Sequence, residues 1–495
     1  MDLEESSSKK FIKNVLKYSP SSIIPALIGF ITLPFLTKLF GPSIYGNYVL
    51  AITVVSILSL IVNTLWGTSI VRFHAFYKKK EELNSFYDTL IVGILLSVIL
   101  ISAVFLIILQ LLKSGMDPYL YTLLLIGIPL FISTALISTL EQFLVAKEKA
   151  SLYSFSIVFR SLVGFIFGII LILIFESGIN GLMVGYIFSY LIIIPFIYYK
   201  IFNGIFIGKS YSKDVKSKLI RYGLPLVISN LSAWILSTSD RYIINLFRGS
   251  FEVGIYSASY SISEYSLVLI WTLFKLSSYP AMVNIWENRG ELETQKYISK
   301  VTRYYLLVGV PAAVGLSVLA IPIIKILTSP EYYSGFIIIP FVAFGALLLG
   351  LQWWAQIGLL LHNKTGRLAT IILVSGILNL VINFILVPQY GYIGAAISTL
   401  VSYFVLLALC IKISNFYLEW NFPTKSFYKI AISSIVMGFF VYNVQLFLGS
   451  GVLDLFIEII VGVFIYLAIL LFLKEFSNEE ISAVDYLRIK LFKKD

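Results

Sequence analysis

The side chains with the clearest chemical potential are charged groups placed within long apolar stretches of the sequence. Four are cations and two are acids: Arg72, Arg160, Arg241, Lys275, Asp240 and Glu264. Placing a charge inside a membrane costs free energy, so charged residues in such stretches are candidates for a functional role. Arginine is suited to phosphate because it offers two parallel hydrogen bonds. The excess of cations therefore predicts a site for an anionic headgroup, such as a phosphate or pyrophosphate.

The two acids predict a different task. A carboxylate within the membrane can bind and release a cation, so Glu264 and Asp240 are candidates for coupling to H⁺ or Na⁺. Asp240 and Arg241 point about 100° apart on a helix, so we expect that they do not simply neutralise each other. Simpler alternatives exist for two of the cations. Arg72 could be only a charge at the inner membrane edge, and Lys275 could extend to the nearby cytoplasmic surface.

Uncharged polar and aromatic side chains form stripes at helical spacing beside these charges. They are Asn63 and Trp66 in one segment, Asn230, Trp234 and Ser237 in a second, and Ser261 in a third. Residues three and four apart share one face of a helix. We expect these faces to turn away from lipid and to line a polar path.

The elements that position these residues are membrane-spanning helices. Apolar residues make up 59% of the 495 residues and charged residues 13%, and a span needs about 20 mostly apolar residues. Fourteen segments qualify: 19–40, 46–66, 88–112, 120–141, 153–175, 181–201, 223–246, 253–277, 303–328, 336–361, 368–388, 392–413, 427–447 and 453–474. The chain is therefore predicted to be an all-α integral membrane protein.

The chain also repeats itself. The segment Leu39-Phe40-Gly41-Pro42-Ser43-Ile44-Tyr45-Gly46 returns, with one insertion, as Leu246-Phe247-Arg248-Gly249-Ser250-Phe251-Glu252-Val253-Gly254. Likewise, Gly178-Ile-Asn-Gly181 before Ser189-Tyr190 matches Gly391-Tyr-Ile-Gly394 before Ser402-Tyr403. Two similar halves in a membrane chain usually flank a substrate path. This pattern predicts a transporter with two six-helix halves.

The repeat divides the chain into predicted parts. These are a cytoplasmic segment 1–18, a lobe 19–201, a cytoplasmic linker 202–222, a second lobe 223–413, two appended helices 414–474 and a cytoplasmic tail 475–495. Lysine and arginine concentrate in alternate loops and at both ends, which predicts that both termini are cytoplasmic. The net charge of +11 is then mainly a topology signal and does not indicate nucleic-acid binding.

Several function classes lack their usual signatures. The chain has no Walker-type phosphate loop, and its lone Cys410 excludes a disulfide and a cysteine-based metal site. No loop is long enough to fold a catalytic domain. We therefore expect no enzymatic activity, no metal and no cofactor.

Four motifs resemble one family. They are Lys17-Tyr18 before the first span, residues 40–46, Ser239-Asp240-Arg241-Tyr242 ahead of Gly254, and residues 388–396. Together they resemble the polysaccharide and O-antigen flippases, the polysaccharide transporter branch of the multidrug/oligosaccharidyl-lipid/polysaccharide exporter superfamily. The resemblance covers roughly residues 10–475.

The resemblance implies two pseudo-symmetric six-helix bundles in a V around a central cavity, plus two C-terminal helices. It implies a cargo of oligosaccharide on a polyprenyl phosphate or pyrophosphate, flipped to the outer leaflet by alternating access for surface polysaccharide assembly. It also implies a location in the plasma membrane, with membrane lipids and a polymerase or glycosyltransferase complex as partners. The alternatives are an ion-coupled multidrug antiporter of the same superfamily, which would show acids dominating the cavity, and a membrane-embedded glycosyl- or acyltransferase.

Overall fold

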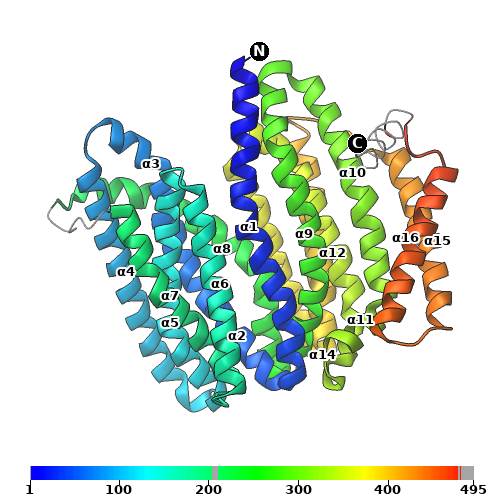
Figure 1. Cartoon of the computed structure of the whole chain (residues 1–495), viewed down its shortest axis with the longest axis horizontal. Helices are drawn as coiled ribbons and strands as arrows, with labels where there is room; N and C mark the ends of the chain where they lie inside the picture. Colours follow the sequence, from blue (N-terminus) through cyan, green and yellow to red (C-terminus); the bar gives the residue numbers. More distant parts are fainter. Residues whose placement is uncertain (1, 203–209, 478–479, 481–495) are drawn as a thin grey trace, which may run out of the picture. The chain divides into compact units, whose positions relative to one another are not determined.

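The computed structural model describes residues 2–202, 210–477 and 480. Every element in this part of the chain is helical (Figure 1). The first half contains α1 (Asp2–Leu39), α2 (Pro42–Val62), α3 (Thr68–Lys79), α4 (Leu83–Leu112), α5 (Pro118–Ala146), α6 (Ala150–Leu173), α7 (Asn180–Phe202) and α8 (Lys213–Arg248). The second contains α9 (Ser250–Arg289), α10 (Glu291–Val318), α11 (Ala320–Leu327), α12 (Ile339–Ala355), α13 (Ile357–Leu361), α14 (Thr365–Ser414), α15 (Thr424–Gln445) and α16 (Val452–Phe472). A π-helical segment, Asn63–Gly67, joins α2 to α3, and 3₁₀ turns cover Lys113–Gly115 and Pro330–Ile338.

Thirteen helical stretches in the described residues are long and apolar enough to cross a membrane. One of them, α14, bends sharply at Gly391 (φ 56°, ψ −139°), so it contains the two spans predicted at 368–388 and 392–413. The all-α membrane fold with fourteen spans is thus confirmed. The predicted span 303–328 is interrupted between α10 and α11, because Pro322 cannot donate a helical hydrogen bond and crowds the preceding turn.

Two compact units make up the chain. The first comprises Met1–Ser257 with Asn383–Gly391, and the second comprises Ala258–Ile382 with Tyr392–Asp495. Helix α8, which opens the second predicted lobe, packs against α2, α3 and α4 in the first unit. The lobe boundaries taken from the repeat remain a prediction.

The predicted terminal and linker segments are only partly described. Helix α1 already begins at Asp2, so most of the predicted cytoplasmic segment 1–18 continues the first span as a helix. Residues 203–209 of the predicted linker, and residues 478–479 and 481–495 of the predicted tail, lie outside the described residues.

In the first unit, α6 packs against α7 and α1. A side chain at Gly185 of α7 would overlap the backbone of Gly164 and Gly168 on α6. These small residues let the two helix backbones approach closely, which is a common basis for helix association in membranes.

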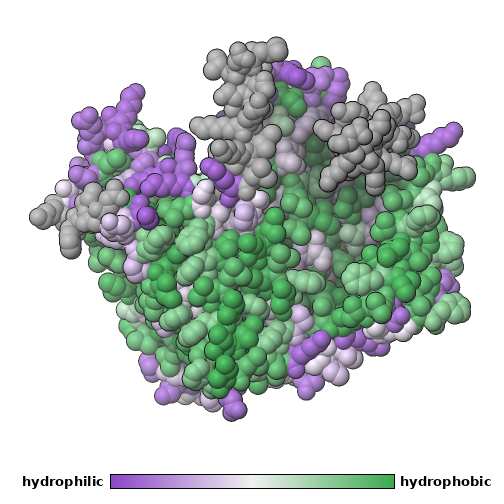
Figure 2. All heavy atoms as spheres, in the orientation of Figure 1, coloured by the Kyte–Doolittle hydropathy of each residue, from purple (hydrophilic) through white to green (hydrophobic). Residues whose placement is uncertain are grey.

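The outward faces of α4 and its neighbours suit hydrocarbon. Along α4, Leu96 is 56% exposed, Ile99 64% and Ile107 60%. Figure 2 shows hydrophobic side chains along the flanks of α4–α7 and hydrophilic side chains at both helix ends. A soluble protein rarely exposes such a continuous apolar surface, whereas lipid matches it.

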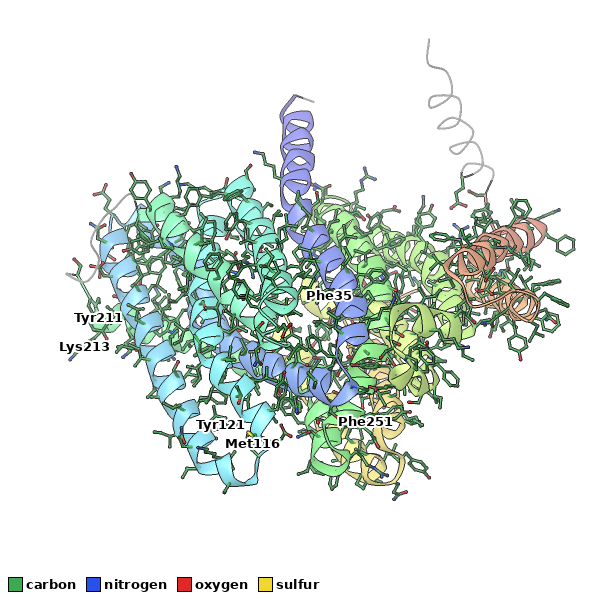
Figure 3. All side chains as sticks on the ribbon, turned by 60° about the horizontal axis from the view of Figure 1, so that its bottom comes forward. Phe35, Met116, Tyr121, Tyr211, Lys213 and Phe251 are labelled. Carbon is green, nitrogen blue, oxygen red and sulfur yellow. The ribbon has the colours of Figure 1, made fainter. Side chains whose placement is uncertain are left out.

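Polar caps lie at the two ends of this unit. At one end, the Asp117 carboxylate accepts hydrogen bonds from the backbone N–H groups of Tyr119 and Leu120, both at 2.8 Å, and so caps α5. At the other end, the backbone N–H of Ser210 donates to Asp88 at 2.9 Å near the start of α4. Figure 3 shows Met116 beside the first cap, and Tyr211 and Lys213 beside the second.

The two copies of the internal repeat cross each other within the first unit. A Cβ at Gly46, near the start of α2, would overlap the carbonyl oxygen of Ser250. A Cβ at Gly254, near the start of α9, would overlap the carbonyl oxygen of Pro42. Glycine at both positions therefore permits direct backbone contact between α2 and α9.

The insertion in the second copy has a structural role. Arg248 donates to the carbonyl oxygens of Pro388 at 2.8 Å and Gln389 at 3.0 Å, so it satisfies carbonyls at the bend of α14. The bend itself depends on Gly391, whose positive φ of 56° matches that of its repeat equivalent Gly178, at 62°. The second repeated motif thus shares a positive φ at its first glycine as well as residue types.

In the second unit, α10 packs against α12, α15 and α16, and α15 packs against α16. Tyr466 of α16 donates to the carbonyl oxygen of Leu307 at 2.8 Å, and Gly462 allows close approach to Val441 of α15. The two appended helices are therefore anchored on α10.

Candidate functional site

A ladder of polar contacts joins α2 and the π-helical segment to α8 within the first unit. Its three side-chain hydrogen bonds are Thr53 Oγ1 with Tyr242 Oη at 2.7 Å, Trp234 Nε1 to Ser56 Oγ at 3.1 Å, and Asn230 Nδ2 to Thr64 Oγ1 at 3.0 Å. Asn230 and Trp234 of the stripe predicted on span 223–246 therefore contact span 46–66 through Thr64 and Ser56. We call these six residues the polar ladder.

Some groups of the polar ladder, and Ser237 beside it, are accessible to solvent although the ladder is hydrogen-bonded internally. Asn230 and Ser56 are exposed, while Trp234 and Ser237 are half-buried. Ser237 is tied to its own helix through a hydrogen bond to the Trp234 carbonyl oxygen at 3.2 Å. Amide, hydroxyl and indole groups in this arrangement can exchange hydrogen bonds with sugar hydroxyls, and the indole offers an apolar face.

The π-helical segment changes the direction of its side chains. Asn63 Oδ1 is buried with no hydrogen-bond partner among the described residues, so it is available to a ligand or water. Trp66, predicted to lie on the same stripe, is only 2% exposed and packs against Gly93 of α4. Its Nε1–H donates to Ser97 Oγ at 3.0 Å. The structure therefore places Trp66 against α4 rather than on the polar ladder.

Asp240 and Arg241 form a buried ion pair in the C-terminal part of α8. Arg241 Nη1 lies 3.3 Å from Asp240 Oδ1 and 3.2 Å from the carbonyl oxygen of Ser237. Tyr256 of α9 donates to the second carboxylate oxygen of Asp240, and its ring lies 5.7 Å from the Arg241 guanidinium carbon. The expectation that adjacent positions would keep the two charges apart is wrong, because the long arginine side chain folds back over its neighbour.

Arg160 also has an acidic partner. Its Nε lies 3.1 Å from Glu141 Oε1, and its Nη1 donates to Tyr190 Oη at 3.3 Å. Ser156 donates to the same Glu141 oxygen at 2.9 Å. The Arg160 side chain is 22% exposed and that of Glu141 only 4%. Arg160 is thus a partly accessible cation held in place by a buried carboxylate.

The other predicted residues lie apart from these pairs. Arg72 is exposed on α3. In the second unit, the Lys275 ammonium lies 3.9 Å from the centre of the Trp353 ring and 5.4 Å from that of Trp271, an attractive cation–π geometry. Ser261 and Glu264 are half-buried on α9 in that unit.

Sequence reasoning missed several partners. Glu141 stands at the last residue of its predicted span and 19 positions before Arg160, so no helical spacing rule connects the two. Tyr242 belongs to the Ser239–Tyr242 motif but was given no site role, and Tyr256 is one of 32 tyrosines that composition does not distinguish. Their one local signal is proximity to Asp240 and Arg241, since Tyr242 follows them directly and Tyr256 lies in the next helix.

Comparisons with known proteins agree on a membrane family. Residues 11–286 match the model of a family described as polysaccharide biosynthesis protein. An uncharacterized membrane protein of Methanocaldococcus jannaschii is 27% identical over 69% of this chain and 69% of its own length. The probable low-salt glycan biosynthesis flippase Agl15 of Haloferax volcanii is 24% identical over 52% of this chain and 55% of its own length.

A solved structure is similar to this chain in its fold. The lipid II flippase MurJ, in an inward closed conformation, is 17% identical and gives a TM-score of 0.76. The match covers 92% of this chain and 99% of that chain. At this identity the likeness establishes the fold.

Proposed function

The chain belongs to the polysaccharide biosynthesis protein family, and on that basis we propose that it is a flippase for lipid-linked oligosaccharide. The cargo would be an oligosaccharide on a polyprenyl phosphate or pyrophosphate, moved from the inner to the outer leaflet by alternating access. The probable flippase Agl15, 24% identical over 261 residues, supports this assignment.

The observation that carries the proposal is the polar ladder together with the buried Arg241–Asp240 pair, all inside helices that otherwise suit lipid. A charged sugar-phosphate head is very costly to move through hydrocarbon, whereas its isoprenoid tail is soluble there. A flippase therefore needs a hydrated groove with sugar-binding groups and a cation, and it need not make or break a covalent bond. The polar ladder offers the sugar-binding groups, and Arg241 offers the cation.

The Asp240 carboxylate gives a physical route to ion coupling. It accepts hydrogen bonds from the Arg241 guanidinium and from Tyr256. If Asp240 binds H⁺ or Na⁺, its attraction for Arg241 falls, and the guanidinium becomes available to a phosphate. Coupling would then follow from competition between two anions for one arginine, with Glu264 as a second candidate on α9.

We also propose the cellular setting. The protein would lie in the plasma membrane with both termini in the cytoplasm. Its basic residues concentrate at both ends and in alternate loops, and loops rich in lysine and arginine stay on the cytoplasmic side. Enzymes that build or polymerise the glycan would be its functional partners.

The test is the leaflet distribution of lipid-linked sugars in cells depleted of this protein, probed with a membrane-impermeant lectin or periodate. We expect lipid-linked oligosaccharide to accumulate on the cytoplasmic side and re-expression to reverse this. Normal exposure on the outer side would overturn the proposal, and drug efflux would become the activity to measure.

The role of Arg241 is tested in the same assay. Because a hydrogen bond to a charged group contributes about 1.5–3 kcal/mol, Arg241→Ala should slow flipping roughly 10- to 100-fold. Arg241→Lys should recover part of the rate because it keeps the charge. Arg221→Ala, on the exposed cytoplasmic end of the same helix, is the matched control. Equal rates in all variants would remove the headgroup role.

A further inference from the structure

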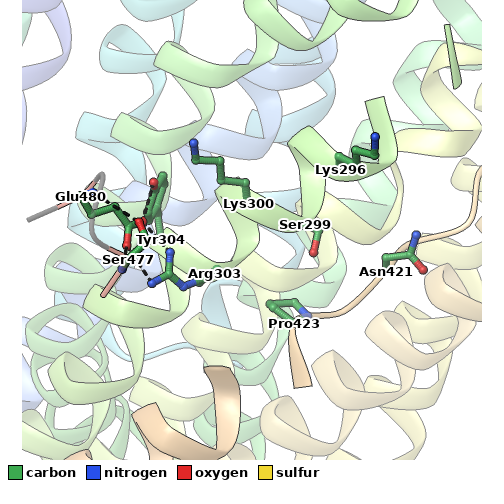
Figure 4. A pocket seen from close by; sticks show the side chains of 9 residues that line it. All are labelled: Lys296, Ser299, Lys300, Arg303, Tyr304, Asn421, Pro423, Ser477 and Glu480. Atoms are coloured by element: carbon green, nitrogen blue, oxygen red, sulfur yellow. Dashed lines mark hydrogen bonds and ion pairs between the residues drawn. The ribbon is translucent and has the colours of Figure 1, made fainter. Parts of the chain in front are cut away.

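A basic cavity lies at the start of α10 in the second unit, well separated along the chain from the polar ladder (Figure 4). Its volume is about 670 Å³, and it is open to the surface. Three elements line it: α10, the loop before α15, and the segment after α16. The lining residues are Lys296, Ser299, Lys300, Arg303, Tyr304, Asn421, Pro423, Ser477 and Glu480.

One wall of this cavity is already neutralised. Arg303 donates to Glu480 Oε1 at 2.6 Å and to Glu475 Oε1 at 2.7 Å. Tyr304 and the backbone N–H of Ser477 also donate to Glu480, both at 2.9 Å. The donors of Arg303 are therefore committed to the segment after α16, which they fasten to α10.

The opposite wall keeps its positive charge. Lys300 forms no ion pair with the described residues, and the Lys296 ammonium pairs at 2.8 Å with Glu293, where the two side chains are 73% and 48% exposed. Ion pairs this exposed contribute little and exchange readily. Ser299 of α10 and Asn421 of the loop before α15 add a hydroxyl and an amide to the lining. These groups together suit a phosphate.

A separate apolar groove is lined by later residues of α10. Its volume is about 510 Å³, and from α10 it includes Leu306, Val310 and Val314. Arg303, Val310 and Val314 are spaced by seven and four residues, so they share one face of the helix. The groove also takes in residues of α12, α14 and α15, and no charged residue is among those that line it.

Successive residues of the loop before α15 line the apolar groove and the basic cavity in turn. Trp420 and Phe422 line the apolar groove, whereas Asn421 and Pro423 line the basic cavity. Trp420 donates its Nε1–H to Thr302 at 3.2 Å. Tryptophan is enriched at the level of lipid headgroups, so this loop marks the boundary between headgroup and hydrocarbon.

We propose that these two spaces form a binding site for one anionic membrane lipid that is distinct from the cargo. Its phosphate lies between Lys296 and Lys300, and one of its hydrocarbon chains fills the groove between α10 and α15. Charge complementarity favours an anionic headgroup over a zwitterionic one, since basic pockets between membrane helices bind anionic lipid headgroups. The bound lipid joins α10 to α15 and so adds to the anchoring of the appended helices.

Native mass spectrometry of the full chain in detergent tests this site by counting lipids retained at increasing lipid concentration. Phosphatidylglycerol should bind one to one, and phosphatidylcholine more weakly. Lys296→Gln with Lys300→Gln should weaken phosphatidylglycerol binding roughly thirtyfold. Each lysine strengthens the attraction to an anionic headgroup by roughly five- to sixfold, and the two factors multiply. The matched control is Lys78→Gln with Lys79→Gln, two exposed lysines on α3.

A second pair of variants tests the groove. Ala431→Phe fills it from α15 and should also weaken phosphatidylglycerol binding, whereas Leu453→Phe, at a residue 78% exposed on α16, should not. Equal binding of the two lipids, or unchanged binding by the lysine variant, would overturn the proposal. Displacement of phosphatidylglycerol by a polyprenyl phosphate at lower concentration would also overturn it, because the site would then belong to the cargo.

Discussion

At Arg160 the guanidinium uses one N–H on Glu141 and another on Tyr190. A phosphate that binds there competes with a buried carboxylate for donors already in use, so Arg160 cannot act as a free cation. The same holds for Arg241, whose partner Asp240 is its neighbour in sequence. In both places an acid holds the arginine in one orientation and reduces the net charge in the membrane. Such pairing is what makes a buried charge tolerable.

A double-mutant cycle tests the Arg160–Glu141 pair. Arg160→Met or Glu141→Gln alone should lower the thermal unfolding temperature in detergent, since each leaves a buried group without its partner. The double variant should recover most of that loss, which corresponds to a coupling of about 1–3 kcal/mol. Losses that simply add would show that the two residues act independently.

Glu480 should respond to acid in a defined range. Its hydrogen bonds from Arg303, Ser477 and Tyr304 lower its pKa from 4.5 to about 2. The pKa is lower in the folded protein, so the contact contributes fully above pH 4.5 and is lost as the pH falls through about 2. We expect hydrogen exchange at residues 473–477, corrected for intrinsic rates, to show the same protection at pH 7 and pH 5 and less protection at pH 3.

The variant Glu480→Gln should raise that exchange at pH 7 because it removes the charge from the contact with Arg303. Glu419→Gln, at an exposed position in the loop before α15, is the control. Protection that stays unchanged from pH 7 down to pH 3 in the unmodified protein would contradict the lowered pKa.

At the scale of elements, helices and spans could be predicted because their signal is local. Long apolar runs located all fourteen spans, including the two that share α14. The π-helical segment could not be predicted, since nothing in Asn63–Gly67 distinguishes it from ordinary helix. Glu141 was missed for another reason: its contact with Arg160 depends on how α5 and α6 rotate against each other.

The crossing of α2 and α9 offers a prediction at the same scale. Gly46→Ala or Gly254→Ala forces a methyl group into the opposing backbone, so each should lower the unfolding temperature despite the higher helix propensity of alanine. Gly315→Ala on α10 meets open space and should be neutral or stabilising by up to about 1 kcal/mol. Thermal unfolding of the three variants checks this, and equal behaviour would refute the close contact.

At the scale of the whole molecule, the orientation of the chain can be tested because its single Cys410 is buried. In a Cys410→Ser background, single cysteines at Gly115 and Ser450 should react with an impermeant maleimide added outside intact cells. Cysteines at Lys79 and Gly366 should react only after the membrane is opened. All four positions are exposed, so a reversed pattern would place both termini outside.

The contact between Gly46 and Gly254 follows a rule normally seen between identical subunits. Gly46 meets Ser250, the repeat equivalent of Pro42, while Gly254 meets Pro42 itself. The same contact therefore occurs twice, with each residue replaced by its repeat equivalent, as in a twofold dimer interface. In a true homodimer every substitution would occur twice, but here each side can change alone. A single polypeptide therefore has the contact geometry of a twofold pair while its two repeat copies are free to differ in charge and chemistry.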